Sequence, residues 1–195
     1  MSQLRIGIIL CSTRPGRKGE QVARWVYEQA SKRDAATYEV IDLLDFDLPL
    51  LDEATSASRG NYANAHTKAW SARIAEFDGF VFVTPEYNHS ISGALKNAID
   101  YLYAEWNNKA AGFVSYGGPS GGTRAVEHLR QIVGELQIAD VRQQVALSLV
   151  HDFENFQTLK PNPRQETLLA TLFEQVEAWS GALRTVRVGA LAVAA

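Results

Sequence analysis

The chain has 195 residues, 46% of them hydrophobic and 21% charged, and its net charge is −3. These values are typical of a globular domain and exclude a strongly basic nucleic-acid-binding surface. The single cysteine, Cys11, excludes an intramolecular disulfide and fits a reducing compartment, so we expect a cytoplasmic protein. We expect no signal peptide and no membrane span, because no stretch reaches the roughly 18 apolar residues that a span needs.

Apolar runs of strand length alternate along the chain with segments in which apolar residues recur at helical spacing. Strands are predicted over residues 4–10, 37–42, 80–84, 110–116 and 141–150. Helices are predicted over residues 19–32, 62–77, 93–103, 125–136 and 168–183. Residues 43–60 have no clear period, and a loop of that length is often functional.

Strictly alternating strands and helices predict a parallel sheet with helices on both faces. We therefore predict an α/β fold, a flavodoxin-like three-layer sandwich whose five-stranded parallel sheet has the order 2-1-3-4-5. In this order a ligand binds beside strands one and three. We expect one domain over residues 1–185 and a tail over residues 186–195, either flexible or covering a subunit contact.

The loop after the first predicted strand has the composition of a phosphate site. Ser12 supplies a hydroxyl, and Arg14, Arg17 and Lys18 supply three cations just before a helix begins. A helix N-terminus with added cations attracts anions. The loop matches neither the Walker A pattern nor G-x-G-x-x-G. We take Ser12 and Arg14 as the strongest candidate ligands and Lys18 as a surface charge; the alternative is a solvated basic loop.

The loop after the third predicted strand suits a flat ring. Pro85 stiffens the chain, Tyr87 can pack against a ring, and Asn88 offers donors and acceptors that match a uracil-like edge. Glu86 either accepts a hydrogen bond or has a structural role. The alternative interpretation is a turn that only starts the following helix.

The loop after the fourth predicted strand contains four glycines within residues 117–122. Such a loop lets the backbone approach a ligand and aim N–H groups at the negative charge that forms on a reduced flavin. Taken alone, it is equally a flexible connection. All three loops open at one edge of the sheet, so they predict a ligand with a phosphate at one end and a planar ring at the other.

Three segments, residues 12–17, 85–100 and 116–118, together resemble the NAD(P)H-dependent FMN reductase family. This flavodoxin-like family includes quinone, azo-dye and chromate reductases, and the resemblance extends over residues 4–185. Residues 48–53 are also similar to the family. Two positions depart from it, because Cys11 stands where glycine is common and Ser92 where proline is common.

The resemblance implies FMN as cofactor, NADPH or NADH as co-substrate, and a homodimer or homotetramer. The residues that it implies around the FMN phosphate are Ser12, Arg14, Arg17 and the backbone of Gly19, Glu20 and Gln21. Those implied around the ring are Pro85, Glu86, Tyr87 and Asn88, with Tyr116, Gly117, Gly118 and Gly121 in the third loop.

The function implied is hydride transfer from a nicotinamide to bound flavin and then to a small acceptor in a ping-pong scheme. The acceptor is a flavin, a quinone, an azo compound or a metal oxyanion. Because the cofactor carries the chemistry, we name no catalytic side chain, and the four histidines show no metal-ligand spacing.

Three alternatives remain open on the sequence: a flavodoxin-like electron carrier, a flavin-binding redox sensor, and a domain for another phosphorylated ligand. A carrier of that kind favours a hydroxyl-rich phosphate loop and a strongly acidic surface. The cations Arg14 and Arg17 and the small net charge therefore favour an enzyme.

Overall fold

The computed structural model describes residues 3–194, and the side chains of residues 3–189. Its main sheet is formed by β1 (Leu4–Leu10), β2 (Ala36–Asp42), β3 (Gly79–Pro85), β4 (Lys109–Gly117) and β5 (Ile138–Ser148). All neighbouring strands in this sheet are parallel and their order is β2-β1-β3-β4-β5. The predicted strand order is confirmed.

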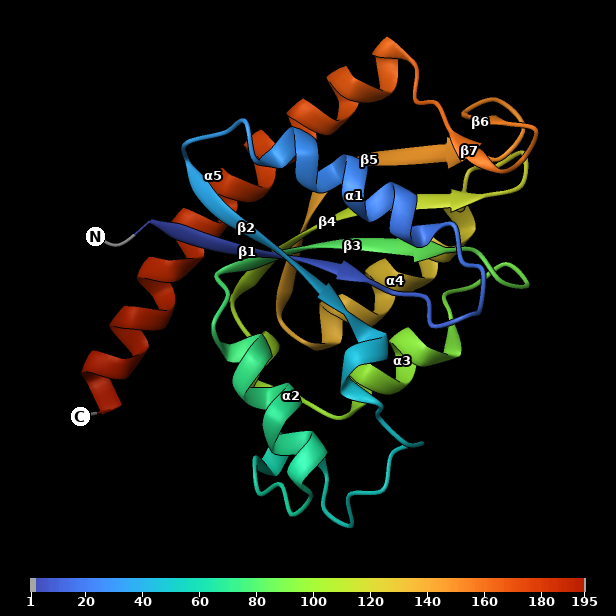
Figure 1. The fold of residues 1–195 in the computed structure, drawn as a ribbon. Helices are drawn as coiled ribbons and strands as arrows, with labels where there is room; N and C mark the ends of the chain where they lie inside the picture. The colour runs from blue at the N-terminus through green and yellow to red at the C-terminus, as the bar shows by residue number, and fades with distance from the viewer. Residues whose placement is uncertain (1–2, 195) are drawn as a thin grey trace.

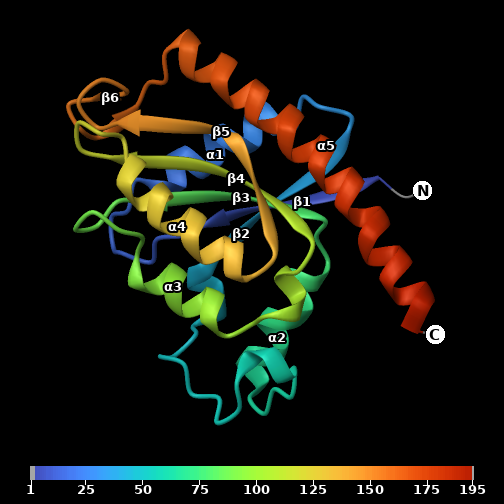
Figure 2. The same cartoon turned by 180° about the vertical axis from the view of Figure 1, so that it is seen from behind.

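Helices cover both faces of the sheet (Figures 1 and 2). On one face lie α1 (Gly19–Ala30) and α5 (Pro163–Ala194). On the other lie α2 (Ala65–Ala75), α3 (Gly93–Asp100) and α4 (Thr123–Glu135). Three short 3₁₀ helices, η1 (Leu43–Phe46), η2 (Ala57–Arg59) and η3 (Ala104–Trp106), lie in the connections. No helix in the described part of the chain is long and apolar enough to cross a membrane.

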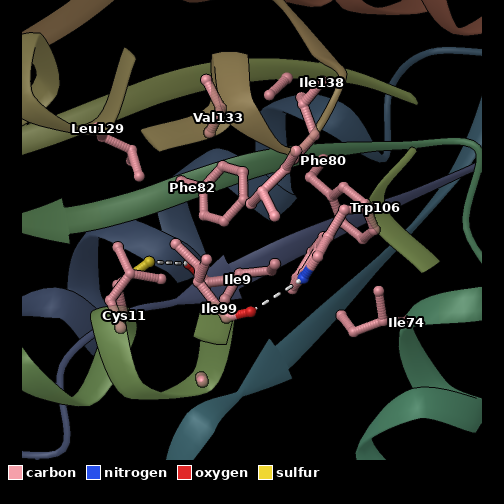
Figure 3. Packing of buried hydrophobic residues seen from close by; sticks show 14 of the residues in the cluster. Ile9, Cys11, Ile74, Phe80, Phe82, Ile99, Trp106, Leu129, Val133 and Ile138 are labelled. Carbon is pink, nitrogen blue, oxygen red and sulfur yellow. Dashed lines mark hydrogen bonds between the residues drawn. The ribbon is translucent and has the colours of Figure 1, made fainter. Parts of the chain in front are cut away.

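The central strands are mostly apolar because both of their faces are buried. In β1, Ile6 and Ile8 pack under α1 and α5, whereas Ile9 faces α3 and α4. Figure 3 shows the apolar cluster on the face of the sheet covered by α2, α3 and α4. In this cluster Phe80 and Phe82 of β3 pack against Trp106. The Phe80 and Trp106 ring centroids lie 5.1 Å apart. This packing fixes the strand ends, and with them the loops that follow.

Several predicted boundaries differ from the structure. The third helix stops at Asp100 instead of 103, because the chain turns into η3 and buries Trp106. The last helix is 32 residues long, about nine turns instead of six. The predicted tail from residue 186 is therefore helical as far as Ala194, and residue 195 lies outside the described residues. The only glycine in that stretch, Gly189, does not end the helix.

A hairpin that the sequence did not predict follows β5. It consists of β6 (Phe153–Glu154) and β7 (Thr158–Leu159), which pair antiparallel. Its turn places Asn155 and Phe156 at φ of 50° and 58°, and the Gln157 N–H donates to the Glu154 carbonyl oxygen over 2.9 Å. The sequence contains no Asn-Gly or Asp-Gly pair at this turn, and such a pair is the usual sequence signal for a hairpin, so the hairpin was not predicted.

Candidate functional site

The loops after β1, β3 and β4 meet at one edge of the sheet and enclose a pocket of about 240 Å³. Eight predicted site residues line it: Arg14, Arg17, Pro85, Glu86, Tyr87, Tyr116, Gly117 and Gly118. Three further residues complete the lining: Gly16, Lys18 and Leu149. The remaining predicted residues lie behind or beside the lining: Ser12, Gly19, Glu20, Gln21, Asn88 and Gly121.

One end of the pocket presents hydrogen-bond donors without protein partners. Arg14 is exposed and makes no ion pair within residues 3–194. Helix α1 begins at Gly19, and because the Gln21 N–H already donates to the Lys18 carbonyl oxygen over 3.1 Å, the N–H groups of Gly19 and Glu20 are the ones left for an anion. A guanidinium beside a helix N-terminus suits a phosphate.

The Tyr116 hydroxyl is the clearest unfilled donor at this end. The side chain is buried, and its oxygen has no hydrogen-bond partner. Burial, and then the nearby Tyr87, raise the pKa of this phenol, so it stays protonated. A buried hydroxyl without a partner costs about 1–3 kcal/mol, which an oxyanion acceptor would recover. This orphaned donor and the neighbouring cation fit the phosphate group of FMN.

Ser12 joins two of the loops. Its side chain is fully buried, and its hydroxyl lies 2.8 Å from the Tyr87 hydroxyl. The next residue back, Cys11, accepts a 2.5 Å hydrogen bond at its carbonyl oxygen from the Ser92 hydroxyl, which also caps α3 by accepting from the Leu95 N–H. These bonds hold the phosphate loop against the ring loop. A phosphate contact by Ser12 stays a prediction.

The guanidinium of Arg17 forms its hydrogen bonds with other groups of the protein. Only 6% of its side chain is exposed. Its guanidinium donates to both carboxylate oxygens of Asp42, to the Ser12 carbonyl oxygen over 2.5 Å and to Glu20 over 3.1 Å. These bonds raise the Arg17 pKa, with Asp42 as the main cause. Arg17 therefore shapes the loop, and a direct phosphate contact by it remains a prediction.

The residues at the start of α1 have different surroundings. Gly19 is buried, and a Cβ there would lie 2.7 Å from the Tyr116 hydroxyl oxygen, so only glycine fits. Glu20 is exposed and pairs with Arg17. The Gln21 side chain is bonded to the β6–β7 hairpin instead of the pocket. None of these three residues lines the pocket, and a phosphate contact by their backbone N–H groups stays a prediction.

The ring loop is a tight turn. Tyr87 and Ser90 exchange two backbone hydrogen bonds of 2.9 and 3.0 Å, and Asn88 and His89 between them have φ of 50° and 67°. Asn88 is exposed at the tip and does not line the pocket. Pro85 and Tyr87 do line it and form its apolar wall. A role for Asn88 at the edge of a ring stays a prediction.

Sequence reasoning missed Arg124, at the second position of α4. It donates to Glu86 from its backbone N–H over 3.2 Å and from its Nε over 2.7 Å. The Glu86 side chain is only 5% exposed, so the pair fixes the ring loop against α4. No motif or spacing signals this pair, because 38 residues separate its members.

The glycine loop provides room for a ligand. A Cβ at Gly118 would meet no atom within 4 Å, so this position leaves the pocket open. Gly117 is crowded by the backbone of Gly122, at 3.0 Å. Gly121 packs against Ala146 with φ of 61° and therefore has a structural role.

Comparison with known proteins identifies relatives of this chain. Residues 4–152 match the family model described as NADPH-dependent FMN reductase. An NAD(P)H-dependent FMN reductase of Schizosaccharomyces pombe is 41% identical over 150 residues, covering 76% of this chain and 74% of its own. A quinone reductase of Escherichia coli K12 is 37% identical over 137 residues, covering 67% and 70%. An oxidoreductase from Corynebacterium diphtheriae shares the fold, with a TM-score of 0.70, 14% identity and coverage of 92% and 98%.

Proposed function

This chain belongs to the NADPH-dependent FMN reductase family, and we propose that its 240 Å³ pocket binds FMN to reduce a small acceptor with NAD(P)H. The observation that supports FMN binding most directly is that one pocket combines an apolar wall with hydrogen-bond donors that have no protein partner and could bind an anion. Arg14, the Tyr116 hydroxyl and the start of α1 are at the first end, and Pro85 and Tyr87 form the wall.

In this proposal the residues bind and orient the cofactor. Arg14 and the α1 amides hold the phosphate, and the Tyr116 hydroxyl donates to one of its oxygens. Pro85 and Tyr87 flank the ring, while Gly118 leaves its pyrimidine end accessible. Bound FMN supplies hydride acceptance from the nicotinamide and electron delivery to the acceptor. No side chain of the pocket needs to act as a general acid or base.

The acceptor class follows from relatives and from the open pocket. The similar protein of Escherichia coli is a quinone reductase, so we propose quinones, with free flavin, azo compounds and metal oxyanions as further candidates. Because one exposed ring face would serve the nicotinamide and the acceptor in turn, we propose ping-pong kinetics. We further propose a cytoplasmic homodimer or homotetramer.

An anaerobic visible spectrum with added FMN, taken before and after NADPH, tests the function. We expect the absorbance of bound flavin to bleach promptly and to return when a quinone is added. Bound flavin that stays oxidised with both nicotinamides would instead indicate a carrier or sensor. No bound flavin would contradict the placement of the cofactor.

Arg14→Ala tests the phosphate site directly. We expect FMN binding to weaken by about 1.5–3 kcal/mol, the usual scale for a hydrogen bond to a charged group. Isothermal titration of the apoprotein with FMN measures this change. Arg24→Ala is the matched control, because Arg24 is an exposed arginine farther along α1. Equal FMN affinity in both variants would remove Arg14 from the site.

A further inference from the structure

The β6–β7 hairpin (residues 153–159) begins just after the segment that matches the family model, which ends at residue 152. Figures 1 and 2 both show it beside the loop that follows β4, at the edge of the sheet where the FMN pocket opens. Leu149, four residues before the hairpin, lines this pocket and donates its N–H to the Gly117 carbonyl oxygen over 2.8 Å. The hairpin therefore stands at the pocket rim.

The hairpin is fixed to the start of α1 by three hydrogen bonds. The Gln157 side-chain oxygen accepts from the Lys18 ammonium over 2.7 Å. The Gln21 side chain donates to the Gln157 carbonyl oxygen and accepts from the Leu159 N–H, each over 2.9 Å. Because Lys18 itself lines the pocket, these bonds place the hairpin against a pocket residue.

The base of the hairpin is equally constrained. The carboxylate of the buried Asp152 accepts from the Ser148 N–H over 2.8 Å and from the Asn162 side chain over 3.0 Å. The Asp152 carbonyl oxygen accepts from the Lys160 N–H over 2.7 Å. With both its base and its side bonded, the hairpin is a rigid arm and its tip has a defined position.

The hairpin tip carries an exposed aromatic side chain, Phe156, and the next residue, Gln157, is bonded to the Lys18 ammonium. Phe156 is 57% exposed and adopts a positive φ, a conformation that costs a non-glycine residue energy without burying its ring. Lys18 is bonded to a neutral amide oxygen and forms no ion pair within the described residues. Two other aromatic side chains are notably exposed among these residues, Tyr27 and Trp179, and neither lines the pocket.

We propose that this rim binds the adenosine 2′-phosphate end of NADPH, with the adenine stacked on Phe156 and the 2′-phosphate against Lys18. The inference rests on the proposed function, because the nicotinamide must enter the pocket to reach the flavin ring. The far end of the dinucleotide then leaves the pocket across its rim, where the hairpin stands. An exposed ring, and a cation held by the adjacent residue of the hairpin, provide stacking and charge for a phosphorylated purine.

Phe156→Ala tests the stacking contact. We expect the KM for NADPH to rise about tenfold, the scale for loss of one base–aromatic stack, with kcat retained. Turnover with reduced nicotinamide mononucleotide, which lacks the adenosine half, should change by less than about twofold. Tyr27→Ala is the matched control and should leave both KM values as in the wild type.

Lys18→Met tests the phosphate contact. We expect the preference for NADPH over NADH to fall about tenfold, the scale of one charge-assisted hydrogen bond. Weaker FMN binding with an unchanged NADPH preference would overturn this assignment and move Lys18 to the FMN phosphate.

Three further outcomes separate this inference from the proposed function. If the wild type binds FMN and oxidises NADPH but Phe156→Ala has the same KM values, the rim site is wrong and the function stands. If Phe156→Ala dissociates an oligomer in analytical ultracentrifugation, the ring is a subunit contact and the rim site is also wrong. If the wild type fails to oxidise either nicotinamide, the proposed function itself fails.

Discussion

Hydroxyl groups at the pocket differ in whether the protein already satisfies them. The Ser12 and Tyr87 hydroxyls are 2.8 Å apart and satisfy each other, whereas the buried Tyr116 hydroxyl has no partner. The two arginines differ in the same way, since Arg17 is bonded to Asp42 and Arg14 makes no ion pair within residues 3–194. Groups that the protein itself leaves unsatisfied are those that a ligand can bind, so Arg14 and Tyr116 are the better candidates.

Tyr116→Phe should separate ligand binding from stability. Removing a buried hydroxyl that has no partner should leave the apoprotein equally stable or stabilise it by about 1 kcal/mol. The same change should weaken FMN binding about tenfold, because a donor to the phosphate is lost. Thermal unfolding without FMN and titration with FMN measure the two effects.

The control is Tyr101→Phe, because the Tyr101 hydroxyl is bonded to the Pro49 carbonyl oxygen at 3.1 Å and to Asp52 at 3.0 Å. That variant should lose stability instead. A destabilised Tyr116→Phe with unchanged FMN affinity would show that the Tyr116 hydroxyl has a partner in solution and no role at the phosphate.

At the scale of elements, α5 is held to the sheet by an ionic contact within an apolar face. Glu177 of α5 accepts from Arg33 over 2.7 and 2.6 Å and from the Tyr38 hydroxyl over 2.7 Å. Burial opposes ionisation of Glu177, but the bonds from Arg33 and Tyr38 outweigh it and lower its pKa below the ordinary 4.5. The ionised carboxylate therefore stabilises the folded state.

Glu177→Gln should change how stability depends on pH. A carboxylate with a lowered folded-state pKa stabilises above its unfolded pKa, and this contribution is lost as the pH falls through the folded-state pKa. We expect the variant to be about 2 kcal/mol less stable than the wild type at pH 7, the scale for hydrogen bonds to a charged group.

The difference between the two proteins should begin to shrink as the pH falls below about 4.5, where Glu177 of the unfolded chain becomes protonated, and should shrink further as the pH falls through the lower pKa of the folded state. Urea unfolding at pH 7, 5 and 3.5 measures it. Glu174→Gln, an exposed position on the same helix, should give parallel curves. A constant difference across this range would show that the charge of Glu177 does not contribute.

At the scale of the whole molecule, one end of the sheet carries the pocket and the other end carries ionic contacts that anchor α5. The pocket lies at the carboxyl ends of the strands, and an ionic cluster lies at their amino ends. There Arg187 of α5 donates to Asp78 over 2.5 Å and to the Asn108 carbonyl oxygen over 2.6 Å. Asp78 also accepts from the Arg5 N–H over 3.0 Å. Arg187 thus anchors the turns of α5 that extend past the sheet in Figure 1.

Arg187→Ala should therefore affect stability and leave ligand binding unchanged. Loss of the Arg187 hydrogen bonds to Asp78 and to the Asn108 carbonyl oxygen should lower the free energy of unfolding by about 1–3 kcal/mol. FMN affinity should remain that of the wild type, the reverse of the pattern expected for Arg14→Ala. The measurements are the free energy of unfolding and the FMN affinity, each determined for Arg187→Ala and for Arg14→Ala. Weaker FMN binding by Arg187→Ala would mean that the two ends of the sheet are coupled.

The sequence alone determined the strand order and the edge at which the site opens, because apolar runs and helical periods are local patterns and parallel strands all end at one edge. It also predicted that Pro85, Tyr87 and Gly118 lie at that edge, because their loops directly follow predicted strands. Only the tertiary structure showed that Arg17 is bonded to Asp42 whereas Arg14 makes no ion pair in the described part of the chain. It also showed that the buried Tyr116 hydroxyl has no partner and that the hairpin is bonded to Lys18. These features depend on contacts between residues far apart in the chain, such as Lys18 and Gln157, which are 139 positions apart, and no local pattern encodes such contacts.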